Sequence, residues 1–175
     1  MHFELKSISL QGIPEALAKA ERYRLLNEPR LAESICLDIL AVVPDHQQAL
    51  ISLLLARTDQ FHLNAHAKPA QEVLVRIRGD YERAYYAGII WERLGQARIR
   101  QGGAAGSAAA HPALREAMHH YERAIPLAAP GNEDAILRWN TCARMIMENP
   151  DVRPSAEEAI HEWVGDEASP ITPDT

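Results

Sequence analysis

The sequence predicts an all-α fold, and three observations support this prediction. Apolar residues recur at three- and four-residue steps along most of the chain, which is the spacing of one face of a helix. Alternating apolar and polar runs, which would indicate strands, are nearly absent. Prolines and short polar breaks divide the pattern into segments of ordinary helix length. With 175 residues, the chain has the size of one domain that can bury a core without disulfides or metals.

Start and stop signals justify the predicted helices in order. Pro14 and Pro29 each suit the first turn of a helix, where a missing N–H costs nothing, and Pro44 stops the second helix. Gly79 ends the fourth helix, and Pro112 is expected to start the sixth. The predicted helices cover residues 13–26, 29–43, 47–59, 68–77, 81–100, 112–125 and 133–147.

Two segments lie outside this helical pattern. Residues 101–111 are biased toward glycine and alanine, and a mobile loop is expected there because the run has few side chains to bury. Ser155 and Glu158 have the spacing of a capping box, which predicts a short acidic C-terminal helix. The expected organisation is an N-terminal segment, a helical body, an acidic capping helix and a disordered tail, at residues 1–12, 13–147, 148–165 and 166–175.

The charge is divided unevenly between body and C-terminal end. The chain carries −6 from 18 basic and 24 acidic residues, but residues 148–175 alone hold eight acids against one arginine. The body is therefore nearly neutral, which disfavours a nucleic-acid partner. No apolar run approaches the roughly 20 residues that span a bilayer, and no signal peptide is visible, so no membrane contact and a cytoplasmic location are expected. In that compartment Cys36 and Cys142 are expected to be free, buried thiols.

A fixed period of 34 residues emerges when the helices are taken in pairs, which begin at Ile13, Gln47 and Tyr81. In the first pair, Ala20 and Ala32 are small residues at the places where two helices must approach closely. A period that agrees with the small-residue positions and with the terminating prolines is typical of stacked helical repeats.

The third pair repeats the same pattern with Gly88 at the small position and Trp91 at the large one. Its second helix supplies a small–aromatic–small triplet, but only after an insertion of about 17 residues relative to the period. That triplet is formed by Ala117, Tyr121 and Ala124.

These features resemble the tetratricopeptide repeat, a 34-residue helix–turn–helix unit with small residues at its eighth and twentieth positions. The resemblance covers residues 13–147, and with the capping helix it gives three to four repeats over residues 13–165. It departs from the family in the second pair, where bulky Leu54 and His66 stand at the small positions. A fourth first helix begins near Asn132, and there Trp139 stands in place of a small residue. Irregular packing is therefore expected in the second pair.

The resemblance implies antiparallel helix pairs stacked as a right-handed α-solenoid, in which the first helices line a concave groove for a peptide or partner helix. Several residues assigned to this groove are apolar, and an exposed apolar surface of this kind is typical of a binding site. The groove residues are Leu17, Glu21, Arg24, Ile51, Leu55, Tyr85, Ile89, Glu92, Ile136 and Asn140.

The chain is accordingly expected to be a non-catalytic adaptor without a cofactor. The same apolar residues are open to two other interpretations, as part of the core or as the contact surface of a homo-oligomer. Leu17 and Glu21 stand where family members that clamp an acidic carboxylate have Lys and Asn, so that specialised role is not expected.

Two further patterns offer alternatives that involve chemistry or RNA. Asp59, His62 and His66 would share one face of a continuous helix and present three metal-capable groups, although a connecting segment fits this region better. A stretch rich in arginine would suit RNA or an acidic partner, including the acidic tail, although a helix face laced with ion pairs explains it more simply. Its basic residues are Arg76, Arg78, Arg83, Arg93, Arg98 and Arg100.

Overall fold

The computed structural model describes residues 3–62 and 66–154. These residues form α-helices and two short 3-10 helices without any strand, which confirms the all-α class. The α-helices are α1 (Ile13–Leu25), α2 (Pro29–Val42), α3 (Gln47–Asp59), α4 (Lys68–Leu74), α5 (Asp80–Gln101), α6 (Gly103–Ala124) and α7 (Asp134–Glu148). The 3-10 helices are η1 (Leu10–Gly12) and η2 (Ile125–Leu127).

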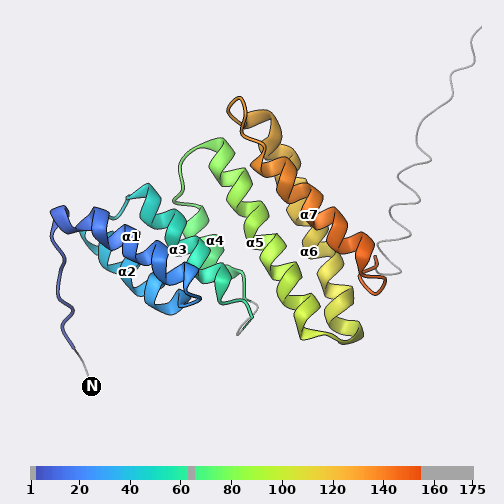
Figure 1. Cartoon of the computed structure of the whole chain (residues 1–175), viewed down its shortest axis with the longest axis horizontal. Coiled ribbons are helices and arrows are strands. Elements are labelled where there is room, and N and C mark those ends of the chain that lie inside the picture. Colours follow the sequence, from blue (N-terminus) through green and yellow to red (C-terminus); the bar gives the residue numbers. More distant parts are fainter. Residues whose placement is uncertain (1–2, 63–65, 155–175) are drawn as a thin grey trace, which may run out of the picture.

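Consecutive helices lie against each other along the molecule. Helices α1 to α4 gather at one end, α5 crosses the middle, and α6 and α7 form the other end (Figure 1). Helix α3 also contacts both α1 and α5. The helices α1, α3 and α5 therefore form a row with α3 in the middle. No helix among the described residues is both long and apolar enough to cross a membrane.

The core consists of two hydrophobic clusters that meet at α5. The first joins α1 to α4 with one side of α5, and the second joins α5, α6 and α7. Cys36 belongs to the first cluster and Cys142 to the second, and both are free thiols without exposure, as predicted. Burial raises the pKa of Cys36 to about 11 and that of Cys142 to about 12, because a thiolate loses its hydration there.

The small residues of the 34-residue pattern lie in the core, as expected. Ala20 and Ala32 are fully buried. A Cβ atom on Gly88 would lie 2.4 Å from Cε1 of the buried Tyr121 ring, so only glycine permits this approach of α5 to α6. In the second pair, α4 is a helix of only seven residues, and His66 lies before its start.

The expected mobile loop at residues 101–111 is wrong, because α6 begins at Gly103 and continues through Pro112. Only Gly102 separates it from α5, and both Gly102 and Gly103 have positive φ angles, which suit this tight reversal. Helix α5 has 22 residues where α1 and α3 have 13, and α6 has 22 where α2 has 14. The extra residues therefore lengthen both helices of the pair instead of forming a loop.

Residues 103–111 are helical because alanine, not glycine, is the commonest residue among them. Alanine has the highest helix propensity of all residues. Gly106 lies close to α5, since a Cβ atom there would be 2.7 Å from the carbonyl oxygen of Arg98. The Arg98 guanidinium in turn donates a hydrogen bond of 2.6 Å to the carbonyl oxygen of Ala109. The run thus packs through its backbone, which the small side chains leave accessible.

A pair of opposite substitutions tests this segment. Gly106→Ala is expected to lower the free energy of unfolding by about 1–3 kcal/mol, because the new methyl group meets a backbone carbonyl that cannot rotate away. Ala108→Gly, at an exposed position of the same helix, is expected to cost about 1 kcal/mol through helix propensity alone. Urea denaturation followed by circular dichroism measures both. A mobile loop would instead tolerate both changes without loss.

The predicted acidic capping helix lies almost entirely outside the described residues, as does the tail at 166–175. Of its residues 148–165, the structure describes those up to Pro154. Glu148 is the last residue of α7, and Val152 is buried in the second cluster. The chain therefore remains packed on the helical body as far as this point.

Candidate functional site

A cleft of about 670 Å³ lies where the C-terminal ends of α1 and α3 meet the second half of α5. We call it the cationic cleft, because three arginines and one aspartate give its lining a net charge of +2. The lining residues are Arg24, Leu25, Asn27, Asp59, His62, Arg93 and Arg100.

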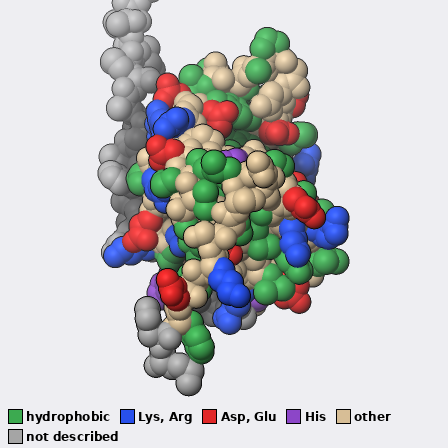
Figure 2. Space-filling model, turned by 90° about the vertical axis from the view of Figure 1, so that its left-hand side faces the viewer, with side chains coloured by type: hydrophobic (Ala, Val, Ile, Leu, Met, Phe, Trp, Pro, Cys, Tyr) green, Lys and Arg blue, Asp and Glu red, His purple; other side chains and the backbone are tan. Residues whose placement is uncertain are grey.

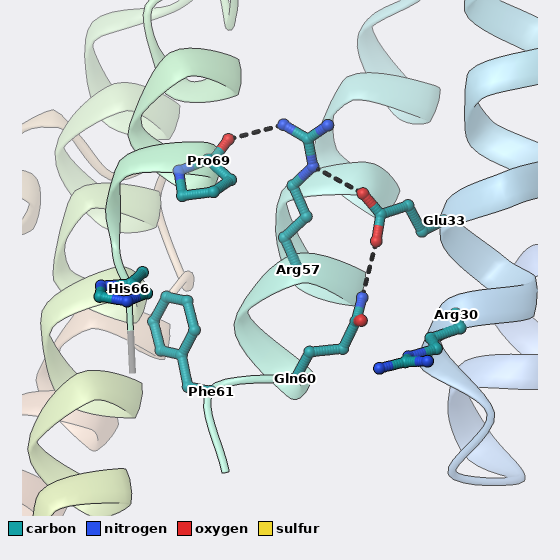
Figure 3. Close-up of a pocket in the computed structure, with 7 residues that line it drawn as sticks. All are labelled: Arg30, Glu33, Arg57, Gln60, Phe61, His66 and Pro69. Atoms are coloured by element: carbon teal, nitrogen blue, oxygen red, sulfur yellow. Dashed lines mark hydrogen bonds and ion pairs between the residues drawn. The ribbon is translucent and has the colours of Figure 1, made fainter. Parts of the chain in front are cut away.

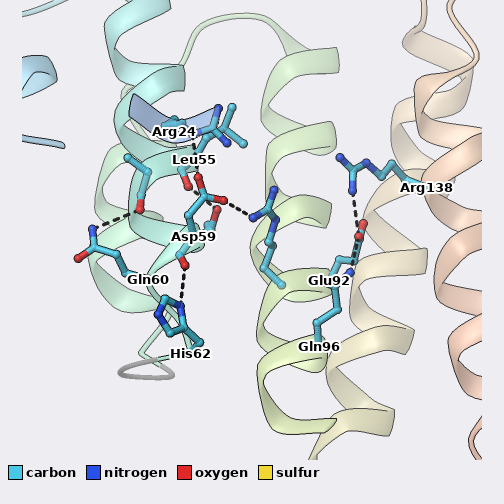
Figure 4. Close-up of polar contacts among 11 residues, drawn as sticks. Arg24, Leu55, Asp59, Gln60, His62, Glu92, Gln96 and Arg138 are labelled. Atoms are coloured by element: carbon cyan, nitrogen blue, oxygen red, sulfur yellow. Dashed lines mark hydrogen bonds and ion pairs between the residues drawn. The ribbon is translucent and has the colours of Figure 1, made fainter. Parts of the chain in front are cut away.

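Asp59 holds the centre of the cationic cleft by binding two arginines from the neighbouring helices. Its Oδ2 atom accepts a hydrogen bond of 2.8 Å from Nε of Arg24 on α1, and its Oδ1 atom is paired with Arg93 on α5 (Figure 4). The three side chains are between 17% and 25% exposed. A guanidinium has five N–H donors, so both arginines retain donors that can face an anion after binding Asp59.

Two further side chains complete the polar rim of the cleft. Arg100 lies in the last turn of α5 and is exposed. His62 is exposed as well, and its Nδ1 atom lies 2.9 Å from the backbone oxygen of Asp59. Positive side chains in the last turn of a helix also interact favourably with the helix dipole, which gives Arg24 and Arg100 a stabilising role in addition to any binding role.

The apolar part of the predicted groove is half-buried and lies on the same row of helices as the cleft. Ile51 and Leu55 on α3 pack partly against the first core cluster, and Tyr85 on α5 packs against the second. Leu55 contacts both clusters, so it spans the junction between α3 and α5. Leu17 on α1 is half-buried too, whereas Glu21 is exposed. Leu17, Ile51, Leu55 and Tyr85 are thus partly accessible to a ligand, and packing against the core holds them in place.

The prediction is wrong for two groove residues, Ile89 and Glu92. Ile89 is 1% exposed and belongs to the second core cluster, and Glu92 is completely buried. The alternative that these positions belong to the core is correct, because α6 and α7 cover this part of α5. On α7, Ile136 is 38% exposed and Asn140 is half-buried.

Glu92 is instead the centre of a buried polar network that the sequence did not reveal. Its carboxylate accepts hydrogen bonds from Gln96 Nε2 at 3.0 Å and from Arg138 Nη1 at 3.0 Å (Figure 4). It also accepts one from the Tyr121 hydroxyl at 2.7 Å. Burial, together with the Glu92 charge, raises the pKa of Tyr121, which keeps its hydroxyl protonated as a donor. The network joins α5, α6 and α7 through one carboxylate.

The six arginines of the basic stretch do not form one patch. Arg78 is paired with Asp45 at 3.0 Å, and Arg83 is paired with Asp80. Arg76 and Arg98 donate to the backbone carbonyl oxygens of Pro44 and Ala109. The alternative of ion pairs within the chain is confirmed for Arg78 and Arg83, and Arg93 is paired with Asp59 as well. Only Arg93 and Arg100 converge, and they do so in the cationic cleft.

The face at the N-terminal end of the molecule has no field of one sign either. Basic and acidic side chains are interspersed there with hydrophobic ones (Figure 2). The large exposed hydrophobic residues of α1, α2 and the segment before them are Phe3, Leu5, Leu10, Leu25, Leu26, Leu31 and Leu37.

A second, smaller pocket of about 220 Å³ lies between α2, α3 and the segment that leads into α4. Its polar groups largely satisfy one another (Figure 3). Glu33 accepts hydrogen bonds from Arg57 Nε at 2.9 Å and Gln60 Nε2 at 2.7 Å, and Arg57 also donates to the Pro69 carbonyl oxygen at 2.7 Å. Glu33 is therefore already engaged within the chain.

The smaller pocket also separates the residues of the metal alternative. His66 lines this pocket, whereas Asp59 and His62 line the cationic cleft. The Asp59 carboxylate is moreover occupied by two arginines. Within residues 3–62 and 66–154, no three histidine, cysteine or acidic side chains are grouped so that they could hold a metal ion.

The spacing of the cleft residues is a signal that sequence reasoning missed. Arg24 and Asp59 are 35 positions apart, and Asp59 and Arg93 are 34 apart, so each step is about one repeat period. Equivalent positions of successive repeats lie side by side, and alternating charges at this spacing therefore indicate ion pairs across the row. Sequence reasoning had placed the three residues in three separate patterns.

Comparison with protein-family models, with curated proteins and with solved structures gave no match. The resemblance to the tetratricopeptide repeat therefore depends on the residues of this chain alone.

Proposed function

We propose that the chain is a non-catalytic interaction module that binds a peptide or a partner helix across α1, α3 and α5. The observation that carries the proposal is the cationic cleft, where Arg24, Arg93 and Arg100 converge from two helices around Asp59. Such a cleft suits one acidic side chain of a ligand, since guanidinium groups bind carboxylates through paired hydrogen bonds. The ligand's apolar side chains would contact the half-buried residues Ile51, Leu55 and Tyr85, which are defined above.

The resemblance to tetratricopeptide repeats supports the same location. We infer that α1/α2, α3/α4 and α5/α6 are the repeat pairs, so that α1, α3 and α5 are the first helices that line the groove of the family. The proposed ligand carries an acidic side chain in addition to the apolar ones that the predicted groove suits. Its recognition combines a charged anchor with apolar contacts, which is a common division between specificity and affinity.

Self-association is the second candidate function. Seven large hydrophobic side chains are exposed at the N-terminal end, and burying them against a second copy of the chain would remove this apolar surface from water. Sedimentation velocity at several concentrations separates the candidates, since an interface between copies shifts the sedimentation coefficient with concentration and a monomeric binding module does not.

Selection of peptides from a random display library against the full chain tests the proposed function. Enriched peptides are expected to share an acidic residue beside apolar ones. Their affinity is expected to fall about tenfold with Arg100→Glu, which reverses one exposed charge of the cleft and corresponds to about 1.4 kcal/mol. The matched control is Arg22→Glu, because Arg22 is exposed on α1 but two residues before Arg24, about 200° around the helix.

Two results would contradict the proposal. One is a set of enriched peptides that binds Arg100→Glu as well as it binds the original chain. The other is an equal loss of affinity with Arg22→Glu, which would indicate attraction to the overall charge instead of the cleft. Circular dichroism of both variants verifies that helicity is unchanged.

A further inference from the structure

We infer that residues 155–175 of the same molecule are an internal ligand of the cationic cleft. This segment contains six acidic residues and neither lysine nor arginine. The acids are Glu157, Glu158, Glu162, Asp166, Glu167 and Asp174. Its charge is thus opposite to that of the cleft, whose three arginines exceed its single aspartate.

The segment also has the mixed chemistry that the cleft and its surroundings accept. Glu158 and Glu162 flank Ile160, and Trp163 and Val164 follow directly. An acidic side chain can bind the arginines while a neighbouring apolar side chain contacts the half-buried surface of Leu55 and Tyr85. A purely charged tail would match only the arginines.

The place where the described chain ends makes this contact geometrically accessible. Helices α5 and α7 run toward the same end of the molecule, and residues 149–154 lie at the end where α5 finishes (Figure 1). Arg138 of α7 reaches Glu92 of α5 at 3.0 Å, so α7 is adjacent to the helix that carries Arg93 and Arg100. Packed helices are about 8–10 Å apart, so a cleft beside α5 lies a few helix spacings from the end of the described chain.

The length of the segment is more than sufficient for this distance. Its 21 residues span about 70 Å when extended, at roughly 3.3 Å per residue. A ligand on so short a tether has an effective concentration in the millimolar range, so a segment whose ion pairs and apolar contacts together give a Kd of about 1 mM occupies the cleft in about half of the molecules.

An internal ligand regulates the cleft by competition. An outside peptide would have to displace residues 155–175, and its apparent affinity would fall by the fraction of molecules in which the cleft is occupied. The inference does not depend on the proposed function, because the acidic segment can occupy the cleft even if no outside partner exists.

Paramagnetic relaxation in the full chain tests the inference. Ala159→Cys introduces a thiol for a nitroxide label, while Cys36 and Cys142 are fully buried. Selective broadening is expected at the backbone amides of Arg24, Asp59 and the second half of α5, and not at those of residues 3–9, which precede the opposite end of α1. The inference would be overturned by broadening that is absent from the cleft or uniform over the surface.

Charge variants of the labelled chain establish the cause of the contact. Converting Glu157, Glu158 and Glu162 to glutamine is expected to lower the ratio of docked to undocked molecules about tenfold. Arg100→Glu is expected to lower the ratio as well. The matched control converts three exposed acids of the body to glutamine, namely Glu4, Glu15 and Glu133. An equal loss in this control would overturn the inference.

A mixed sample distinguishes contact within one molecule from contact between copies. One chain carries ¹⁵N without the nitroxide, and the other carries the nitroxide without ¹⁵N. No broadening is expected in this mixture at low concentration, since the tether acts within one molecule. Broadening of the cleft in the mixture would show that the segment binds a second copy and would overturn the inference as stated. Failure of the peptide selection alone would leave this experiment unaffected.

Discussion

Glu92→Ala is expected to lower the free energy of unfolding by about 3 kcal/mol, one of the two largest losses expected for a single substitution in this chain. The change removes the acceptor of the buried Tyr121 hydroxyl and the partner of the Arg138 guanidinium. Breaking a buried ion pair on one side costs roughly 3–5 kcal/mol, because the remaining charge has lost its hydration. We expect the lower end of that range, since Arg138 is 36% exposed and can recover part of its hydration.

Urea denaturation of the full chain measures this loss, and two further variants separate charge from packing. Glu92→Gln keeps the size of the side chain and one acceptor oxygen, and it is expected to cost less than the alanine variant. The double variant Glu92→Met, Arg138→Met removes both charges and is expected to recover part of the stability, because apolar residues can replace a buried ion pair while the Tyr121 hydroxyl still lacks its acceptor. A loss below 1 kcal/mol for Glu92→Ala would contradict the buried network.

The same residue explains why periodicity predicted the groove only in part. Helical spacing correctly places Ile89 and Glu92 on one face of α5, since they are three residues apart. Spacing within one helix does not reveal what covers that face. The Tyr121 hydroxyl reaches Glu92 across 29 positions and Arg138 across 46, and nothing local in the sequence specifies those contacts. The first half of the row, with Leu17, Arg24 and Leu55, keeps the partial exposure that a groove requires.

More of the secondary structure than of the site could be predicted from the sequence, because helix caps and helix breaks depend on residues that are close together in the chain. The start of α2 at Pro29 and the start of α3 at Gln47 were predicted at the observed residues. The one large error, at residues 101–111, came from treating glycine and alanine as equivalent. Alanine favours a helix, and Gly106 is needed because α6 approaches the backbone of α5 there.

The cationic cleft can be predicted from the sequence only when charged residues about 34 positions apart are compared with one another. Arg24, Asp59 and Arg93 each have a simple explanation alone, as groove, metal or basic-patch residues. Their spacing of 35 and 34 positions relates them, and the structure brings them together. Arg100 and His62 do not follow the period, so their place at the rim could be learned only from the structure.

Leu54→Ala is expected to lower the free energy of unfolding by about 2–5 kcal/mol. Leu54 is fully buried in the first core cluster, and truncating a buried leucine removes apolar contacts and leaves a cavity. The tetratricopeptide resemblance gives this substitution a second meaning, since a small residue is the family's usual choice at this position. The expected loss therefore depends on whether α3 keeps a spacing from its neighbours that only a large side chain fills.

Urea denaturation measures the free energy of unfolding of Leu54→Ala and of three variants that serve as comparisons. Leu54→Met conserves volume and is expected to cost less than about 1.5 kcal/mol. Leu55→Ala, at the half-buried neighbouring position, is expected to cost less than Leu54→Ala because less apolar surface is lost. Ala20→Leu reverses the size change at the corresponding position of α1, where the side chain is fully buried, and overpacking there is expected to cost about 1–3 kcal/mol.

Leu54→Ala and Ala20→Leu together test whether the helix packing in the second pair, α3/α4, differs from that in the first pair, α1/α2. Losses for both Leu54→Ala and Ala20→Leu mean that α1 and α3 make contacts of different width, so the two helix pairs are not interchangeable. The short helix α4 is consistent with this difference, because its seven residues cover less of α3 than a full second helix does. If Leu54→Ala costs less than about 1 kcal/mol, α3 closes onto its neighbours, and the irregular packing expected for the second pair is wrong.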